Sequence, residues 1–515
     1  MTKQISVRRT GFVVFSFRIV SIFTGLAFLL MMTRTLSTAQ FGLWEVVLDL
    51  VTFASYPAGL LVYWATRDIA RGRMLGKTAL GMNLVLSAVG MVLYVGFSYV
   101  TGGRVGQSDL MTFLLAIFLV PIAYWNQAGN AIVQGYDPIV QGYSTIASEI
   151  AKLAFAFPLL IVFHVGIDGV IVALMAANFT QAATSTVLAR GALELPFDPA
   201  VGRRWIRRSW LPSLSTLPYV LGVADTFVAT LAAGGTITVG YYQAAFAVAS
   251  LAGYSFYLGA ALYPLLLRGG AGSEELPTTI LDLSLLFGIP LAVGAAALAK
   301  PILFVLSPRS LYYVESSTAL MILAFAALVN ATAMILDQVL AGRETIDADE
   351  SAGFRHFVHS NLFFVFLVNI GNTAIYVSSV FVIVSVGTSS GAPASTTIDL
   401  WAAAQLIVFS TFVAARVVRI RKSGRLSLRP SFLKYVAGSA IMAVFFVVAR
   451  GVLDYSSEGF EFTGELAAIG LIGVGIYFAF LFATERNFRR LVRVVLRPLI
   501  GRGATGAAAA PPGGL

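Results

Sequence analysis

The chain has 515 residues, of which 58% are hydrophobic and only 12% are charged, and its mean hydropathy is +0.83. Soluble domains are about 45–50% apolar and about 25% charged, so the composition excludes a soluble protein and indicates a chain that crosses a membrane many times. The lack of cysteine excludes disulfides, thiol nucleophiles and thiolate metal ligands. The net charge of +10 does not indicate nucleic-acid binding, because the basic residues gather at alternate ends of the apolar runs.

The apolar runs predict an all-α polytopic membrane protein with about fourteen transmembrane helices, each able to cross about 30 Å of hydrocarbon. The first run is longer than a signal-peptide core of about 7–15 residues and lacks a cleavage site, so we expect it to be a retained anchor. The first six helices are predicted at 9–32, 41–65, 77–100, 109–134, 142–163 and 168–189. The next six are predicted at 209–232, 238–267, 279–305, 314–341, 355–386 and 399–418, and the last two at 432–452 and 464–483.

The basic residues predict the orientation of these helices. Of the 35 Lys and Arg, 28 fall in segments on the side of the N-terminus, including seven, from Arg416 to Lys434, that are counted with the loop between the twelfth and thirteenth helices. Five fall on the other side, and two, Arg18 and Lys152, fall within the membrane. By the positive-inside rule we expect a multi-pass protein of the cell membrane with both termini cytoplasmic.

An internal repeat divides the chain. "RRTGFVVFSFR…RTLSTAQFGLWE" is similar to "RRSWLPSLSTL…LAAGGTITVGYYQ" at a shift of about 198 residues, with Gly42 and Gly240 at matching positions. The repeat predicts two parallel six-helix lobes related by a pseudo-two-fold axis along the membrane normal, plus two C-terminal helices, an arrangement typical of transporters. The expected divisions are an N-terminal lobe (1–190), a cytoplasmic linker (191–208), a C-terminal lobe (209–418), two additional helices (419–485), and a basic amphipathic segment with a disordered tail (486–515).

Several motifs carry a resemblance to a known family. The outer turn "RTLSTAQFGLWE", the "YWATRDIARGR" end of the second helix and the "QVLAGRE" end of the tenth resemble the polysaccharide (Wzx-type) flippases of the multidrug/oligosaccharidyl-lipid/polysaccharide exporter superfamily. The resemblance covers roughly residues 5–485, and lipid II flippases of this superfamily also carry two extra C-terminal helices. It implies transport of polyprenyl-(di)phosphate-linked sugars to the outer leaflet, with basic residues of a central cavity holding the anionic head group.

Arg18 is the most unusual residue, because it lies roughly 13 Å inside the first helix. A charge at the centre of a lipid-facing helix costs about 2.5–3.5 kcal/mol on insertion scales. Arg18 is therefore expected either to form an ion pair with Asp49 or Glu149, or to bind a phosphate through its planar guanidinium. The two roles are compatible if the substrate's phosphate displaces the carboxylate, and a side chain reaching toward the inner interface is a third alternative.

Further charges are predicted inside the membrane. Lys152 is three residues from Glu149 on one helix face, so it is either an internal ion pair or a second contact for the phosphate. Glu45, Asp49 and Asp225 are candidates for a coupling site that binds H⁺ or Na⁺, with structural pairing as the alternative.

Polar and basic groups elsewhere suggest weaker contacts. Asn126, Gln127 and Asn130 in the fourth helix are expected to bond either sugar hydroxyls or neighbouring helices. His356 and His359 have no evident third ligand, so no metal site or other cofactor is predicted. The basic segments "RVVRIRKSGRLSLRP" and "ERNFRRLVRVVLRPLI" are expected to bind anionic inner-leaflet lipids.

The leading hypothesis is a flippase for lipid-linked oligosaccharide that works by alternating access and serves surface polysaccharide or glycan assembly. Glycosyltransferases or a polymerase of the same pathway are the expected protein partners. The alternative is a cation-coupled multidrug antiporter of the same superfamily. An integral-membrane glycan polymerase or ligase is less favoured, because outer loops such as "SVGTSSGAPASTTID" leave no room for a catalytic domain; the chain is therefore expected to be a transporter and not an enzyme.

Overall fold

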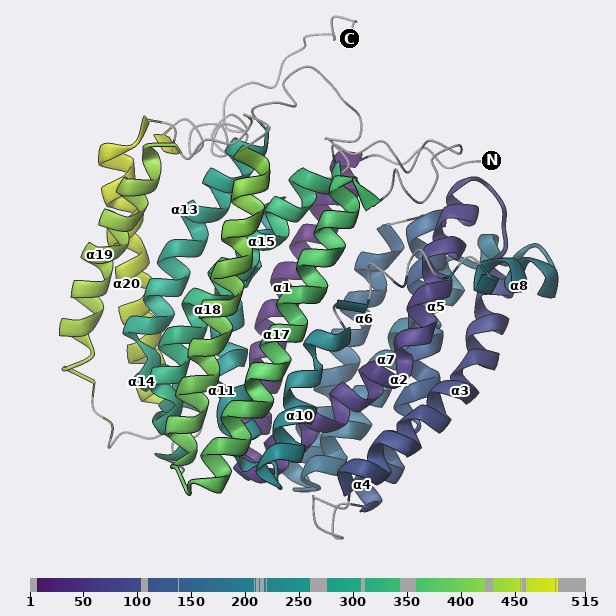
Figure 1. Cartoon of the computed structure of the whole chain (residues 1–515), viewed down its shortest axis with the longest axis horizontal. Coiled ribbons are helices and arrows are strands. Elements are labelled where there is room, and N and C mark those ends of the chain that lie inside the picture. The colour runs from purple at the N-terminus through teal and green to yellow at the C-terminus, as the bar shows by residue number, and fades with distance from the viewer. Residues whose placement is uncertain are drawn as a thin grey trace, which may run out of the picture.

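The fold is known from a computed structural model, shown in Figure 1, which describes residues 7–102, 110–137, 139–207, 209, 213, 217–218, 220–259, 276–306, 311–342, 358–421, 429–453, 455, 460–486 and 488–489. Within these residues every regular element is a helix, and there is no β-strand. Among the described residues, eleven helices are long and apolar enough to cross a membrane, and two shorter apolar helices accompany them. The chain is therefore an all-α, multi-pass membrane protein, and this prediction is confirmed.

The N-terminal lobe has a helix at each of its six predicted positions. The fourth is divided in two, and the fifth ends in a π-helical turn, Phe157–Val162. The helices are α1 (Val7–Thr35), α2 (Thr38–Ala70), α3 (Gly76–Gly102), α4 (Leu110–Ala116) with α5 (Leu119–Tyr136), α6 (Ile139–Ala156) and α7 (Ile167–Leu188).

The C-terminal lobe follows the same order. Parts of the predicted helices 209–232 and 238–267 lie outside the described residues. The helices are α10 (Ala224–Ala233), α11 (Ile237–Gly253), α13 (Leu276–Ala297) with α14 (Ala299–Leu306), α15 (Ser317–Gly342), α17 (Asn361–Ser389) and α18 (Ala394–Arg421).

The two lobes repeat one packing scheme. In the N-terminal lobe α1 packs on α6, α2 on α3 and α5, α3 on α5, and α7 on both α5 and α6. In the C-terminal lobe α10 packs on α17, α11 on α13 and α15, α13 on α15, and α18 on both α15 and α17. Each of these pairs has its counterpart in the other lobe, which is the relation that the sequence repeat predicts.

The lobes meet where α2 and α11 begin, and the contact is reciprocal. A Cβ atom added to Gly42 would lie 2.1 Å from the carbonyl oxygen of Thr236, and one added to Gly240 would lie 2.2 Å from that of Thr38. Both glycines and both threonines are 198 residues apart, so the pseudo-two-fold axis passes between the two helix starts. Because only glycine permits so close an approach of two backbones, this small-residue contact fixes the spacing of the lobes at the end opposite to the termini.

Two predicted helices are broken, and a proline accounts for each break. The sequence predicts continuous helices over 109–134 and 279–305, but Pro121 and Pro301 lack the N–H that would bond the carbonyl four residues earlier. The carbonyl of Ala297, freed by Pro301, instead accepts a hydrogen bond from Nη1 of Arg450 at 3.4 Å. This bond joins the break between α13 and α14 to Arg450, the residue that directly follows helix α19 (Ser431–Ala449).

The two additional helices, α19 (Ser431–Ala449) and α20 (Phe460–Thr484), pack on α13, on α14 and on each other. Their apolar side chains form a separate buried cluster with those of α13, and this cluster includes Phe446, Phe462 and Tyr477. The pair therefore extends the C-terminal lobe on one side and leaves the N-terminal lobe uncovered (Figure 1).

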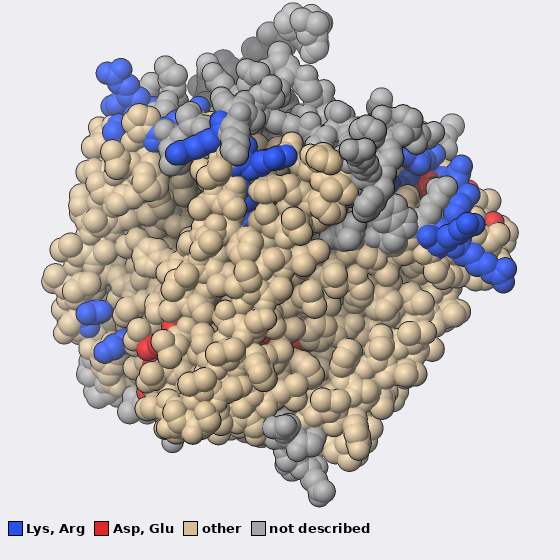
Figure 2. Space-filling view, in the orientation of Figure 1, with Lys and Arg blue, Asp and Glu red and all other residues tan. Residues whose placement is uncertain are grey.

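The linker between the lobes is folded against the N-terminal lobe. Its helix α8 (Pro199–Arg207) lies on α2 and α3 at the end of the bundle where α1 begins (Figure 1). Trp205 is buried, and its Nε1 donates to Oδ2 of Asp68 at 2.9 Å. Figure 2 shows most of the described Lys and Arg side chains gathered at this same end.

Candidate functional site

A cavity of about 700 Å³ with charged and polar side chains in its walls opens inside the helix bundle. Its walls come from α10, α11, α15, α17 and α18 of the C-terminal lobe and from α2 of the N-terminal lobe. Four carboxylates line it, those of Glu45, Asp49, Asp225 and Asp337. Of the charged residues that the sequence predicts inside the membrane, all but Asp225 belong to the N-terminal lobe. The cavity instead draws most of its lining from the C-terminal lobe, because α2 is the N-terminal helix that packs most closely against α10 and α11.

Asp225 is held on both sides of its carboxylate. Oδ2 accepts a hydrogen bond from the hydroxyl of Tyr376 at 2.6 Å, and Oδ1 accepts one from the backbone N–H of Thr226 at 2.8 Å. Asp225 is 9% exposed and Tyr376 is 3% exposed. The carboxylate therefore has a fixed orientation at the cavity wall.

A network of aromatic and amide groups supports Tyr376. Its hydroxyl oxygen accepts from Nε1 of Trp401 at 2.9 Å and lies 3.0 Å from the hydroxyl of Tyr242. The Tyr242 hydroxyl donates to Oε1 of Gln405 at 2.8 Å, and its ring stacks on Trp401 with centroids 3.7 Å apart. These residues join α11, α17 and α18 behind Asp225, and sequence reasoning did not find them, because no local pattern links positions so far apart.

Asp49 and Glu45 approach Asp225 from the other lobe. The Thr226 hydroxyl donates to Oδ2 of Asp49, so that α2 and α10 are joined next to Asp225. Glu45 lies one helical turn away on the same face of α2 and forms no hydrogen bond or ion pair with any residue that the structure describes. Like charges repel more strongly in a medium of low dielectric than in water, so binding of a proton or a metal cation among these groups would relieve repulsion across the lobe contact.

Asp337 of α15 is the fourth carboxylate of the cavity wall. Its Oδ1 and Oδ2 accept from Nε and Nη2 of Arg416 at 2.7 and 3.1 Å, and Nη2 also donates to Oδ1 of Asn369 at 2.7 Å. The Arg416 side chain is 2% exposed. Counting Arg416 with the cytoplasmic loop was therefore wrong, because α18 continues to Arg421 and carries Arg416 into the interior.

The charged pair predicted on the fifth helix is present. Nζ of Lys152 lies 2.6 Å from Oε2 of Glu149, and the Thr24 hydroxyl of α1 donates to the same oxygen at 2.5 Å. Nζ also lies over the ring of Phe28, 5.5 Å from its centroid. This cluster joins α6 to α1 and does not line the cavity described above. Arg18 belongs to α1, but its side chain lies outside the described residues, so its two roles remain predictions.

The amide side chains of α5 are bonded to neighbouring helices. Nδ2 of Asn126 donates to Oδ1 of Asn178 and Oε1 of Gln181, both on α7, at 3.0 and 3.1 Å. Asn130 donates to Asn126 at 3.4 Å, whereas its own Oδ1 is buried without a hydrogen-bond partner. Gln127 donates to the backbone carbonyl of Ser55 on α2 at 3.4 Å. These groups therefore join helices within the N-terminal lobe, and the sugar contact proposed for them stays a prediction.

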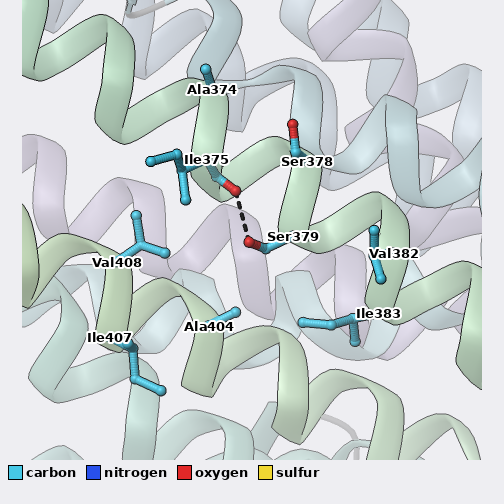
Figure 3. A pocket seen from close by; sticks show the side chains of 9 residues that line it. All are labelled: Ala374, Ile375, Ser378, Ser379, Val382, Ile383, Ala404, Ile407 and Val408. Atoms are coloured by element: carbon cyan, nitrogen blue, oxygen red, sulfur yellow. Dashed lines mark hydrogen bonds between the residues drawn. The ribbon is translucent and has the colours of Figure 1, made fainter.

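The outer side of α17 and α18 carries an apolar groove of about 680 Å³ (Figure 3). Ile375 and Val382 of α17 face Ile407 and Val408 of α18 across it. The hydroxyl of Ser379 donates to the carbonyl of Ile375 at 2.7 Å, so this polar group is satisfied within its own helix. A single layer of two helices thus separates this lipid-compatible surface from the carboxylate-lined cavity.

A resident metal has no evident ligand set in the part of the chain that the structure describes, since no three His, Cys, Asp or Glu side chains converge there. His356 lies outside the described residues. The site thus consists of carboxylates, hydroxyls and amides, which can bind protons, monovalent cations or polar groups of a substrate.

Two repeated helical lobes around an intramembrane cavity form the fold, and solved structures of membrane transporters share this fold. The structure is similar to the lipid II flippase MurJ in an inward closed conformation, with a TM-score of 0.66, 13% identity, and coverage of 94% of this chain and 100% of that one. It is also similar to an inward-facing multidrug resistance MATE family transporter of the MOP superfamily, with a TM-score of 0.56, 13% identity, and coverage of 78% and 94%. A MATE structure in the straight conformation gives a TM-score of 0.54 at 12% identity, with coverage of 80% and 95%.

No protein-family model matches the chain, and a search of curated protein sequences also finds no match. The likeness to solved structures therefore establishes the fold. None of these three neighbours is a Wzx-type flippase, and the assignment to that family remains a prediction.

Proposed function

We propose that this protein is a flippase that translocates polyprenyl-(di)phosphate-linked oligosaccharide from the cytoplasmic to the outer leaflet by alternating access. The end of the bundle that carries the termini and most of the basic side chains is the cytoplasmic one. The protein acts in the cell membrane in the assembly of surface polysaccharide or glycan. Glycosyltransferases supply its substrate, and a polymerase of the same pathway is a second partner.

The observation that carries this proposal is the helix pair α19–α20. The match to the lipid II flippase covers 94% of the chain and leaves fewer residues uncovered than these two helices contain, so it includes at least part of the pair. The MATE transporter is matched over 94% of its own length but covers only 78% of this chain. The additional pair therefore favours a lipid-linked substrate over a small drug.

Cationic side chains in the membrane would hold the phosphate. Arg18 is the first candidate, since it is always charged and donates bidentately. Lys152 is the second, and its pairing with Glu149 keeps an ammonium group inside the bundle that a phosphate could reach by displacing the carboxylate. Asn126 and Asn130 lie on α5 of the same lobe, where they could bond sugar hydroxyls.

The carboxylates of the cavity would couple transport to an ion. Asp225 contacts α17 through Tyr376, and Asp49 contacts α10 through Thr226. Binding of H⁺ or Na⁺ at Glu45, Asp49 and Asp225 would therefore change the interaction between the two lobes. Such a change is what alternating access requires.

A second function, cation-coupled multidrug export, is favoured by one observation. The four charged residues that line the cavity are all acidic, and none of the described lining residues is Lys or Arg. A chamber of this kind would suit a cationic drug. The two proposals differ in the substrate and share the ion.

Reconstituted proteoliposomes separate the two functions. A fluorescent polyprenyl-diphosphate oligosaccharide is placed in both leaflets, and a membrane-impermeant quencher reports how much label reaches the accessible leaflet. The flippase proposal expects rapid loss of the protected fraction with the wild-type protein and the slow basal rate with Arg18→Ala. Export of a cationic dye driven by a proton or Na⁺ gradient, without movement of the lipid, would replace the flippase with the antiporter.

A further inference from the structure

A second groove lies on the outer face of the N-terminal lobe, between α3, α5 and α7. Its volume is about 630 Å³, within the range of about 300–1,000 Å³ that is usual for small-molecule sites. Leu84, Ile122 and Phe179 line it, and the polar atoms of Trp125 and Thr186 bond to each other at 3.0 Å. The groove thus presents hydrocarbon along its length, as an acyl chain requires.

Two cations extend the helix faces that form this groove. Lys77 is three and four residues before Leu80 and Gly81, which line the groove on α3, so it lies on the same face one turn closer to the cytoplasmic end. Arg190 begins the 3₁₀ turn Arg190–Leu193 just after α7, four residues beyond Thr186 and at the same end of the bundle. Both side chains are exposed, and neither forms an ion pair or hydrogen bond with a residue that the structure describes.

The linker adds an interfacial segment at the same end. The ring of Phe197 lies over Gly81, where a Cβ would be only 2.8 Å from it. Phe197 and Leu195 are nevertheless 46% and 45% exposed, beside the arginines of α8. Exposed apolar side chains next to basic ones are typical of a segment at the boundary between head groups and acyl chains.

The position of the groove distinguishes a resident lipid from transported cargo. Its three walls belong to the N-terminal lobe, whereas the lobes meet chiefly through α2 with α10 and α11. The groove therefore shares no lining residue with the carboxylate-lined cavity. A bound lipid could remain there while the lobes move.

We infer that the groove between α3, α5 and α7 is a site for an anionic glycerophospholipid of the cytoplasmic leaflet, with an acyl chain in the groove and the phosphate at Lys77 and Arg190. Hydrocarbon alone would accept any membrane lipid, so the two cations supply the selectivity. The site is independent of the transported substrate.

Native mass spectrometry of the full-length protein tests the inference. The probes are phosphatidylglycerol and phosphatidylcholine with identical acyl chains. A contact with a basic residue near an anionic surface is worth about 1 kcal/mol, or about fivefold, so Lys77→Ala/Arg190→Ala should weaken phosphatidylglycerol binding about 25-fold. Phosphatidylcholine carries the same phosphate next to a quaternary ammonium that the two cations repel, so its binding should weaken by less than twofold. Leu84→Trp, which fills the groove and keeps both charges, should also weaken phosphatidylglycerol binding.

The matched control is Arg71→Ala/Arg73→Ala, which removes two exposed basic residues from the connection between α2 and α3. It should leave phosphatidylglycerol binding within twofold of the wild type. The inference is overturned if the control weakens binding as much as the Lys77/Arg190 variant, or if Leu84→Trp has no effect. A competition experiment with a polyprenyl phosphate gives a third test. If this lipid displaces phosphatidylglycerol from the wild type but not from Leu84→Trp, the groove binds the transported substrate and the inference is overturned.

Discussion

Replacing Asp337 by Asn should destabilise the protein through the guanidinium that it leaves behind. Arg416 is 2% exposed and makes two hydrogen bonds to Asp337, one to Asn369 and one, at 3.1 Å, to the carbonyl of Phe412. Breaking a buried ion pair from one side typically costs about 3–5 kcal/mol. Asp337 is 18% exposed and borders the cavity, so water reaches it, and we expect Asp337→Asn to lower the free energy of unfolding by about 3 kcal/mol.

The double variant Asp337→Asn/Arg416→Met tests whether the unpaired charge is the cause. Removing the guanidinium as well should restore about 2 kcal/mol, since no buried charge then lacks a counter-charge. Denaturant unfolding of the purified protein in one detergent, read as a double-mutant cycle, gives the coupling energy directly.

A solvent-exposed pair provides the comparison. Arg73 and Asp68 lie 3.7 Å apart with the Arg73 side chain 58% exposed, so Arg73→Met should change the free energy of unfolding by less than about 1 kcal/mol.

Equal losses of unfolding free energy in Asp337→Asn and in the double variant would show that the Asp337–Arg416 pair contributes through shape alone, and the electrostatic reasoning would be wrong.

Three further predictions concern transport. Gly42→Ala should reduce lipid flipping at least tenfold in proteoliposomes, because its Cβ would collide with a backbone carbonyl of the other lobe. Gly96→Ala, which has open space around it, should leave the flipping rate unchanged. Equal flipping rates in the two variants would show that the lobe contact plays no part in the transport cycle. Arg18→Ala should abolish flipping while membrane insertion, measured by fractionation, is unchanged; normal flipping would exclude Arg18 as the phosphate ligand. Asp225→Asn should remove the dependence of transport on a proton or Na⁺ gradient, and Tyr376→Phe, which loses a single hydrogen bond to that carboxylate, should weaken the dependence without removing it; an unaltered gradient dependence in Asp225→Asn would place the coupling ion elsewhere.

The fold was largely predictable because membrane helices are specified by local composition. Each of the fourteen predicted spans coincides wholly or partly with a helix, and the repeat of Thr38–Gly42 at Thr236–Gly240 already contained the contact between the lobes. The breaks at Pro121 and Pro301 were not predicted. A proline does not lower the hydropathy of an apolar segment, so the segment still reads as one continuous helix. Whether the helix breaks depends on the backbone, and in particular on whether another donor reaches the carbonyl that the proline leaves unbonded.

The site was only partly predictable. Asp49 and Asp225 were recognised because an acidic residue in an apolar run is rare, and the structure places both at the cavity. Arg416 was missed because it lies at the edge of a basic cluster, and the positive-inside rule already accounts for a basic residue at that position. Its burial depends on Asp337 and Asn369 of two other helices, and such a coincidence in space leaves no trace in local sequence.

The reciprocal placement of Gly42 and Gly240 has a consequence for how this end of the molecule can separate. Each glycine faces the carbonyl of the threonine that precedes its counterpart, so a rotation of the lobes about their shared axis loosens both approaches together. The hydrogen bond of 2.9 Å from the Thr236 hydroxyl to the carbonyl of Ala39 is then the bond that a parting motion must break there. A seam built from two copies of one short motif can open as a unit, and any larger side chain introduced into either copy would hold both apart.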